Sequence, residues 1–243
     1  MPKANRYFIK GQQYHLTHRC HNRSFLLKFA KDRNAYREML RKKLSAYRTP
    51  LLGYCVTSNH VHLLVTAMDE KRISQLMDSL DGDFAQAYNL QKGRSGAFWS
   101  GRYHATAIGD RTQLWNCLVY IDLNMVRAGA VDYPSEWSWC SYGELTGVRK
   151  RYRLIDHNHF EMAFGSRPDD PYFQANYTAC VKQKIASKQL NREPFWSESL
   201  AVGSERYLNE VEAMIARRRK VQYIEPASSA EGWVLKESPP NYG

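Results

Sequence analysis

The spacing of hydrophobic positions predicts four strands within the first 110 residues. The stretch GQQYHLTHRCHNR (11–23) alternates with a period of two, which is typical of a strand. Its two faces carry different residues, with Tyr14, Leu16, His18 and Cys20 on one and His15, Thr17 and Arg19 on the other. Two β-prone runs, 51–57 and 60–66, are separated by a Ser-Asn pair and predict a hairpin. A further strand is predicted within AFWSGRYHATAI (97–108), after a glycine-rich break.

A second period, of three and four residues, predicts amphipathic helices between these strands. They cover residues 31–48, 71–90 and 110–128. The first has Asp32 as a candidate N-cap. The third is the clearest, because Asp110 and Gln113 form a capping-box pattern and Gly129 stands at the C′ position.

The order of these elements, β-α-β-β-α-β followed by a helix, predicts a ferredoxin-like α+β sandwich. Beyond about residue 150 the patterns weaken. A turn-rich break covers 166–171, a helix with Ser204 as N-cap is predicted over 203–220, and we expect the last twenty residues to be frayed. We therefore expect one domain over 1–150 and a mostly helical accessory region over 151–243.

The strand 60–66 places two histidines on one face. Side chains two residues apart point the same way in a strand, so His60 and His62 share a face, while Val61, Leu63 and Val65 share the other. Two neutral imidazoles at this spacing could chelate one divalent cation. The alternative is that they simply occupy a half-exposed strand. A second pair, His157 and His159, lies in a weakly patterned stretch, and we expect no function there.

The helix 110–128 has a polar stripe that could complete such a site. Its buried stripe consists of Leu114, Leu118, Ile121 and Met125. A second stripe, turned by roughly 135° at about 100° per residue, consists of Asn116, Tyr120, Asn124 and Arg127. A tyrosine hydroxyl can act as a covalent nucleophile, an amide oxygen can bind a hard cation, and a guanidinium can hold a phosphate. The alternative is a solvated helix face.

Positive charge is concentrated in the N-terminal part of the chain. The 243 residues carry a net charge of +11, and residues 1–150 hold 22 of the 35 Lys and Arg but 12 of the 24 Asp and Glu. This segment therefore accounts for +10, which is typical of a protein with a polyanionic partner such as nucleic acid.

The remaining composition indicates a cytoplasmic protein. No apolar run approaches the roughly 18–20 residues of a membrane span, and no apolar stretch that could form a signal peptide follows the first residues. The five cysteines are odd in number and form no CxxC pair. We therefore expect reduced thiols, with no disulfide framework or zinc-thiolate site and no membrane partner.

Four segments together resemble a known family. NHVHLLV, FWSGRYHATAI, YIDLNMVRAGAV and EWSWCSY resemble, in order and spacing, the single-tyrosine HUH transposases, and most closely the REP-associated tyrosine transposases. The resemblance covers roughly residues 6–147. It implies that His60 and His62 bind a divalent cation, usually Mg²⁺ or Mn²⁺, with Asn124 as third ligand. It also implies that Tyr120 is the nucleophile.

The resemblance further implies a ferredoxin-like fold and a single-stranded DNA substrate bearing hairpins, as in REP-like palindromes. Such DNA is cleaved and rejoined through a 5′-phosphotyrosine intermediate, by a monomer or a homodimer. We expect four arginines to contact its phosphates, namely Arg19, Arg23, Arg102 and Arg127. The basic face of helix 31–48 would follow the strand, and Tyr103 or Trp99 could stack on an unpaired base, although both also fit a core.

The chain departs from the family pattern at two places. Met125 stands where much of the family has proline, and RCHNR (19–23) replaces R-G-N-N-R, so the contacts of the first strand are less certain. A domesticated hairpin-binding regulator with little or no catalysis is the main alternative function. An RNA-binding module would need an aromatic-rich central strand, and the charge of +10 disfavours a hydrolase of small substrates.

Overall fold

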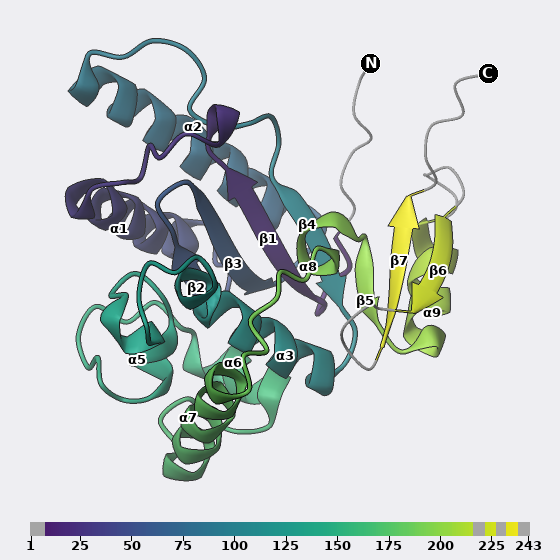
Figure 1. The fold of residues 1–243 in the computed structure, drawn as a ribbon. Helices are drawn as coiled ribbons and strands as arrows, with labels where there is room; N and C mark the ends of the chain where they lie inside the picture. The colour runs from purple at the N-terminus through teal and green to yellow at the C-terminus, as the bar shows by residue number, and fades with distance from the viewer. Residues whose placement is uncertain (1–7, 216–221, 227–231, 238–243) are drawn as a thin grey trace.

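The computed structural model describes residues 8–215, 222–226 and 232–237. These residues form a seven-stranded sheet in the order β2-β3-β1-β4-β5-β7-β6, with helices on both faces (Figure 1). Within the described ranges, no helix is both long and apolar enough to cross a membrane.

The first six regular elements follow the predicted order. They are β1 (Gln13–Arg19), α1 (Ala30–Ala46), β2 (Leu51–Val56), β3 (His60–Thr66), α2 (Arg72–Lys92) and β4 (His104–Ile108). Strand β1 lies between β3 and β4 and is antiparallel to both, and β2 pairs antiparallel with β3 at the edge. This βαββαβ arrangement confirms the ferredoxin-like sandwich.

The C-terminal helix of the sandwich is divided into two. Helix α3 (Arg111–Asp122) begins after Asp110, whose side chain accepts a hydrogen bond from the Gln113 backbone N–H, as the capping pattern predicts. It ends at Leu123, and α4 (Asn124–Arg127) follows immediately. The predicted continuous helix over 110–128 is therefore wrong at Leu123. Gly129 has a φ of +63°, as expected for the residue after a helix end.

Two other local predictions were wrong. Phe29, not Asp32, is the N-cap of α1. The Asp32 carboxylate is instead buried in the first turn and pairs with Lys92 at 3.0 Å. The strand predicted over 97–108 begins only at His104, and Trp99 forms an isolated bridge with Cys20.

The sheet separates two hydrophobic cores. Helices α1 and α2 cover one face, where Val61, Leu63 and Val65 of β3 are buried. Helix α3 covers the other face, where Leu64 is packed. The alternation of β3 therefore directs His62 towards α3, as the period of two predicts.

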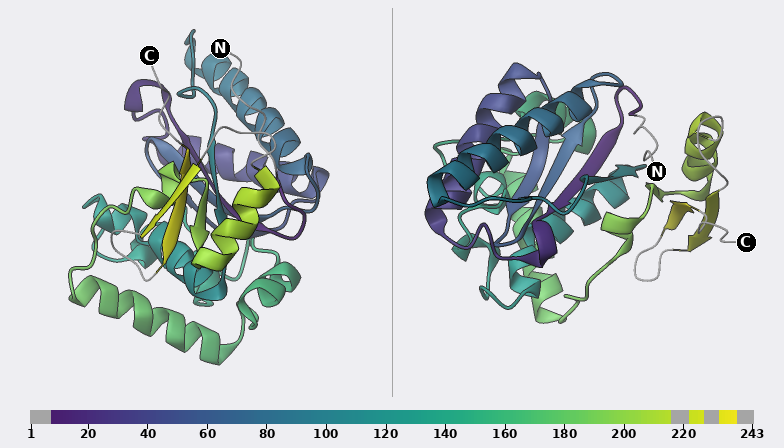
Figure 2. Two further views of the ribbon diagram at one scale, coloured as in Figure 1. Left: turned by 90° about the vertical axis from the view of Figure 1, so that its right-hand side faces the viewer. Right: turned by 90° about the horizontal axis from the view of Figure 1, so that it is seen from above.

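The C-terminal region contains helices and also strands that the sequence did not predict. After α5 (Tyr142–Leu145) come α6 (His157–Phe164), α7 (Pro171–Ala186), α8 (Phe195–Glu198), β5 (Ala201–Gly203), α9 (Glu205–Ile215), β6 (Gln222–Pro226) and β7 (Trp233–Glu237). Strand β5 pairs in parallel with β4, so the sheet continues into this region. Figure 2 shows β5–β7 and α9 gathered at one end of the sheet.

The prediction of a frayed end was wrong for β6 and β7, whereas residues 227–231 and 238–243 lie outside the described residues. The N-cap prediction for α9 is supported, because the Tyr207 backbone N–H donates to Ser204 Oγ at 3.3 Å. The rest of the predicted helix, 216–220, also lies outside the described residues. The domain division at residue 150 stays a prediction.

A buried carboxylate joins α3 to the C-terminal region. Asp122 is 1% exposed and accepts hydrogen bonds from Ser141 Oγ and Tyr177 Oη, each at 2.7 Å. Tyr177 lies on α7 and is fully buried. Helix α7 is thus tied to the helix that carries the candidate nucleophile.

We predict that Tyr177→Phe lowers the free energy of unfolding by about 1–3 kcal/mol, because a buried carboxylate loses one of its donors. Chemical denaturation would measure the change. Tyr172→Phe, at a 77% exposed position of the same helix, is the matched control and should change it by less than about 0.5 kcal/mol. Equal effects of the two substitutions would contradict the assigned role of the hydrogen bond.

Candidate active site

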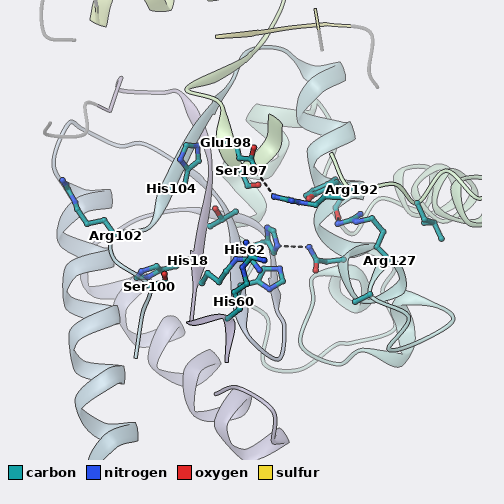
Figure 3. Close-up of a pocket in the computed structure, with 17 residues that line it drawn as sticks. His18, His60, His62, Ser100, Arg102, His104, Arg127, Arg192, Ser197 and Glu198 are labelled. Atoms are coloured by element: carbon teal, nitrogen blue, oxygen red, sulfur yellow. Dashed lines mark hydrogen bonds and ion pairs between the residues drawn. The ribbon is translucent and has the colours of Figure 1, made fainter. Parts of the chain in front are cut away.

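A cavity of about 550 Å³ opens between β1, β3, α3 and the C-terminal segment that precedes β5. Figure 3 shows His60 and His62 near its centre, with Arg127 and Arg192 on one side and Arg102 and His104 on the other. All eight residues that the sequence analysis selected line it, namely Arg19, Arg23, His60, His62, Arg102, Tyr120, Asn124 and Arg127. The structure brings these residues together, and their individual roles stay predictions.

The turn before β3 orients His60. Its Nδ1 lies 2.7 Å from Asn59 Oδ1 and 2.9 Å from Thr57 Oγ1. Because the amide oxygen can only accept, His60 Nδ1 carries the proton and Nε2 keeps its lone pair. Burial, together with the charges of Arg19 and Arg127, lowers the pKa of His60 to about 3. The ring is therefore neutral near pH 7.

The strand β3 and the helix α4 together position His62. Its Nε2 lies 2.8 Å from Asn124 Nδ2, and its Nδ1 lies 2.8 Å from Nε2 of His15. Burial holds the pKa of His62 well below its usual range, and the neighbouring His60 acts in the same direction. His62 is therefore also a neutral imidazole, the form that binds metals.

Tyr120 lies edge-on to the histidines. Its ring centroid is 6.2 Å from that of His62, and the side chain is 8% exposed. The Arg127 guanidinium lies 3.8 Å from the centroid of the Tyr120 ring and donates to the Tyr120 carbonyl at 2.8 Å. Burial raises the pKa of Tyr120, whereas the charge of Arg127 lowers it. Arg127 therefore favours the phenolate that a nucleophilic step requires.

The sequence analysis missed the C-terminal wall of the cavity. Leu190, Arg192, Ser197 and Glu198 line it, and Arg192 pairs with Glu198 at 2.6 Å. The segment is held to β4, because His104 Nε2 donates to the Ser199 carbonyl at 2.8 Å and Thr106 Oγ1 donates to the same oxygen at 2.8 Å. The weak hydrophobic pattern after residue 150 gave no signal for this contact.

Charge around the cavity is strongly positive. Among the lining residues, five arginines stand against the single carboxylate of Glu198.

Two aromatic residues proposed as stacking platforms are instead buried, since Tyr103 is 4% and Trp99 is 9% exposed. Trp99 stacks on His18 at a centroid distance of 4.3 Å. These two rings belong to the core and leave little surface for a base.

The polar groups fit a divalent cation. In the described part of the chain, no three His, Cys, Asp or Glu side chains gather where they could hold a metal ion. The candidate site instead has two neutral histidines whose Nδ1 atoms are already hydrogen-bonded, together with the Asn124 carboxamide. His157 and His159 lie on α6 and do not line this cavity.

The ferredoxin-like sheet and the convergence of the paired histidines with a helical tyrosine agree with what the resemblance to the single-tyrosine HUH transposases implies. Residues 8–124 match the family model described as "Transposase IS200 like". Residues 8–124, slightly less than half of the chain, are thus similar to the IS200-like transposases.

Two relatives extend the comparison. The chain is 26% identical over 154 residues to a REP-associated tyrosine transposase of Haemophilus influenzae, covering 58% of this chain and 86% of the relative. A solved structure of a REP-associated tyrosine transposase bound to a REP hairpin shares the fold, with a TM-score of 0.50 and 22% identity. That match covers 64% of this chain and 91% of the other. A substantial part of this chain therefore extends beyond what it shares with either.

Proposed function

We propose that this protein is a transposase that cleaves and rejoins hairpin-bearing single-stranded DNA through a 5′-phosphotyrosine at Tyr120, with a divalent cation at His60, His62 and Asn124. The observation that carries the proposal is the convergence of a tyrosine, two neutral histidines and a carboxamide in one cavity lined by arginines. The hairpin substrate is proposed from the solved relative that is bound to one.

The chemistry follows from the charge of a phosphodiester. Tyr120 Oη would form a bond to the scissile phosphorus while the bond to the 3′ oxygen breaks, and the leaving oxygen takes up a proton. Attack by a 3′-OH on the phosphotyrosine reverses the step and rejoins DNA without an external energy source. Arg127, which already contacts the Tyr120 ring, would favour loss of the phenolic proton and hold a non-bridging oxygen.

The cation would be held by His60 Nε2, His62 Nε2 and the Asn124 amide oxygen, once the Asn124 amide turns its oxygen to the place where its nitrogen now lies 2.8 Å from His62 Nε2. Mg²⁺ or Mn²⁺ suits such a set with added water or phosphate oxygens. When bound, the cation would polarise the scissile phosphate and orient it for in-line attack.

The DNA strand would follow the arginines of the cavity. Arg23 is exposed in the short 3-10 helix His21–Arg23 that follows β1, and Arg19 and Arg102 line the same cavity. Phosphate contacts of this kind supply affinity that falls with salt and carries little sequence information.

A hairpin-binding regulator that cuts slowly is the second candidate. The observation that favours it is the burial of Tyr120, which raises the pKa of its phenol and disfavours the phenolate. The two functions share DNA binding and differ in the covalent adduct.

We predict that Tyr120→Phe abolishes both strand cleavage and the covalent protein–DNA adduct, because it removes the nucleophilic oxygen and keeps the ring. Incubation with hairpin oligonucleotide and Mn²⁺, followed by denaturing gels and mass spectrometry, would test this. Tyr152→Phe, at a 75% exposed position outside the cavity, is the control and should retain the adduct. An adduct on another tyrosine would contradict the mechanism. A wild-type protein that binds the hairpin without forming any adduct would support the second candidate, a hairpin-binding regulator.

We predict that His60→Ala and His62→Ala each lose cleavage while most hairpin affinity remains, because phosphate contacts by arginines dominate binding. EDTA should have the same effect on the wild type. Gel shifts and cleavage assays on one oligonucleotide would separate the two quantities. Wild-type cleavage by either variant in Mg²⁺ would show that the metal assignment is wrong.

We predict that Arg23→Ala weakens hairpin binding and reduces the slope of log affinity against log salt by about 1, the loss of one phosphate contact. Arg206→Ala, on α9 and outside the cavity, is the matched control and should leave the slope unchanged. Fluorescence anisotropy at several salt concentrations would measure both. Equal slopes for Arg23→Ala and the wild type would remove Arg23 from the DNA path.

A further inference from the structure

His15 is a fully buried histidine of β1 that contacts a candidate metal ligand. Its Nε2 lies 2.8 Å from His62 Nδ1, and the two rings stack at a centroid distance of 5.0 Å. Its Nδ1 lies 2.8 Å from the backbone carbonyl oxygen of Trp196. His15 therefore links the C-terminal segment to the histidine pair.

The Trp196 carbonyl determines where the protons of this chain of hydrogen bonds lie. A carbonyl oxygen only accepts, so His15 Nδ1 must carry a proton. A second proton on Nε2 would create a fully buried cation whose two ring nitrogens face a carbonyl and a neutral imidazole, neither of which carries a compensating charge. His15 Nε2 is therefore an acceptor, and His62 Nδ1 donates to it.

The opposite side of His62 agrees with this assignment. The Asn124 amide nitrogen, a donor, faces His62 Nε2 at 2.8 Å, so Nε2 carries a lone pair. We propose that His15 is a positioning residue that holds His62 as the Nδ1-protonated tautomer and so keeps the lone pair on Nε2, which accepts from the Asn124 amide here and would bind a cation once that amide turns. Its place in catalysis rests on the proposed function, whereas the tautomer itself does not.

Contacts of Trp196 with its neighbours hold its backbone carbonyl in place. The Trp196 side chain is fully buried, and its Nε1 donates to Glu193 Oε2 at 2.5 Å. The one hydroxyl proton of Thr106 lies between the Ser199 carbonyl, at 2.8 Å, and the Trp196 carbonyl, at 3.1 Å. Thr106 also pairs directly with His15 between β4 and β1. Outer hydrogen bonds of this kind orient a ligating imidazole, and their loss typically weakens metal binding by about 10–100-fold.

The tautomer can be measured in metal-free protein by ¹⁵N NMR of the histidine rings, with the His62 signals assigned by their loss in His62→Gln. The inference expects His62 protonated at Nδ1 and unprotonated at Nε2, and His15 likewise protonated at Nδ1. A His62 ring protonated at Nε2 would overturn it, whether or not the protein cleaves DNA.

Two variants test the consequence for metal binding. His15→Phe keeps a ring but removes both hydrogen bonds, and we expect Mn²⁺ affinity measured by calorimetry to fall about 10–100-fold. His15→Gln can still donate to Trp196 and accept from His62, so its affinity should lie closer to the wild type. Thermal unfolding would verify that both variants fold.

An unchanged affinity in His15→Phe, or equal losses in the two variants, would overturn the inference. If the wild-type protein binds no Mn²⁺ but its His62 is protonated at Nδ1, the tautomer assignment stands and the proposed function is refuted. If neither variant folds, the NMR measurement on the wild type still decides.

Discussion

The antiparallel register between β1 and β3 is the constraint on which the site depends. It places Thr17 opposite His62 and Arg19 opposite His60, so the polar face of β1 meets the histidine face of β3. A shift by one residue would turn both histidines into the core beneath α1 and α2. The burial of Val61, Leu63 and Val65 on that side opposes such a shift. The core thus fixes the direction of the candidate metal ligands.

The C-terminal segment adds a second constraint from the other side of the cavity. Trp196 contacts His15 through its backbone, its ring lies 6.1 Å from that of Tyr120, and Arg192 and Glu198 close the rim. These residues lie outside the span that matches the family model, 8–124. The same segment therefore contacts His15, which supports the candidate metal ligand His62, and the candidate nucleophile Tyr120. It also lines the path proposed for DNA.

Local periodicity predicted the elements and the faces of the site, because both depend on neighbours in the sequence. The period of two placed His60 and His62 together, and the helical period placed Tyr120 near Asn124. Tertiary pairing was harder to predict. The role of His15 depends on the strand register and on a carbonyl 181 residues away. Asp32 lies inside the first turn of α1, where it pairs with Lys92, a residue distant in the sequence. Strand β5 has only three residues, too few for a recognisable alternation.

The convergence of His60, His62 and Asn124 on one cation is the central claim, and anomalous diffraction from crystals grown with Mn²⁺ tests it most directly. The account predicts a peak within coordination distance of Nε2 of both histidines and of the Asn124 amide oxygen, on the side of the cavity that faces Tyr120. A peak that contacts only one of the two histidines, or one located at His157 and His159 on α6, would contradict it.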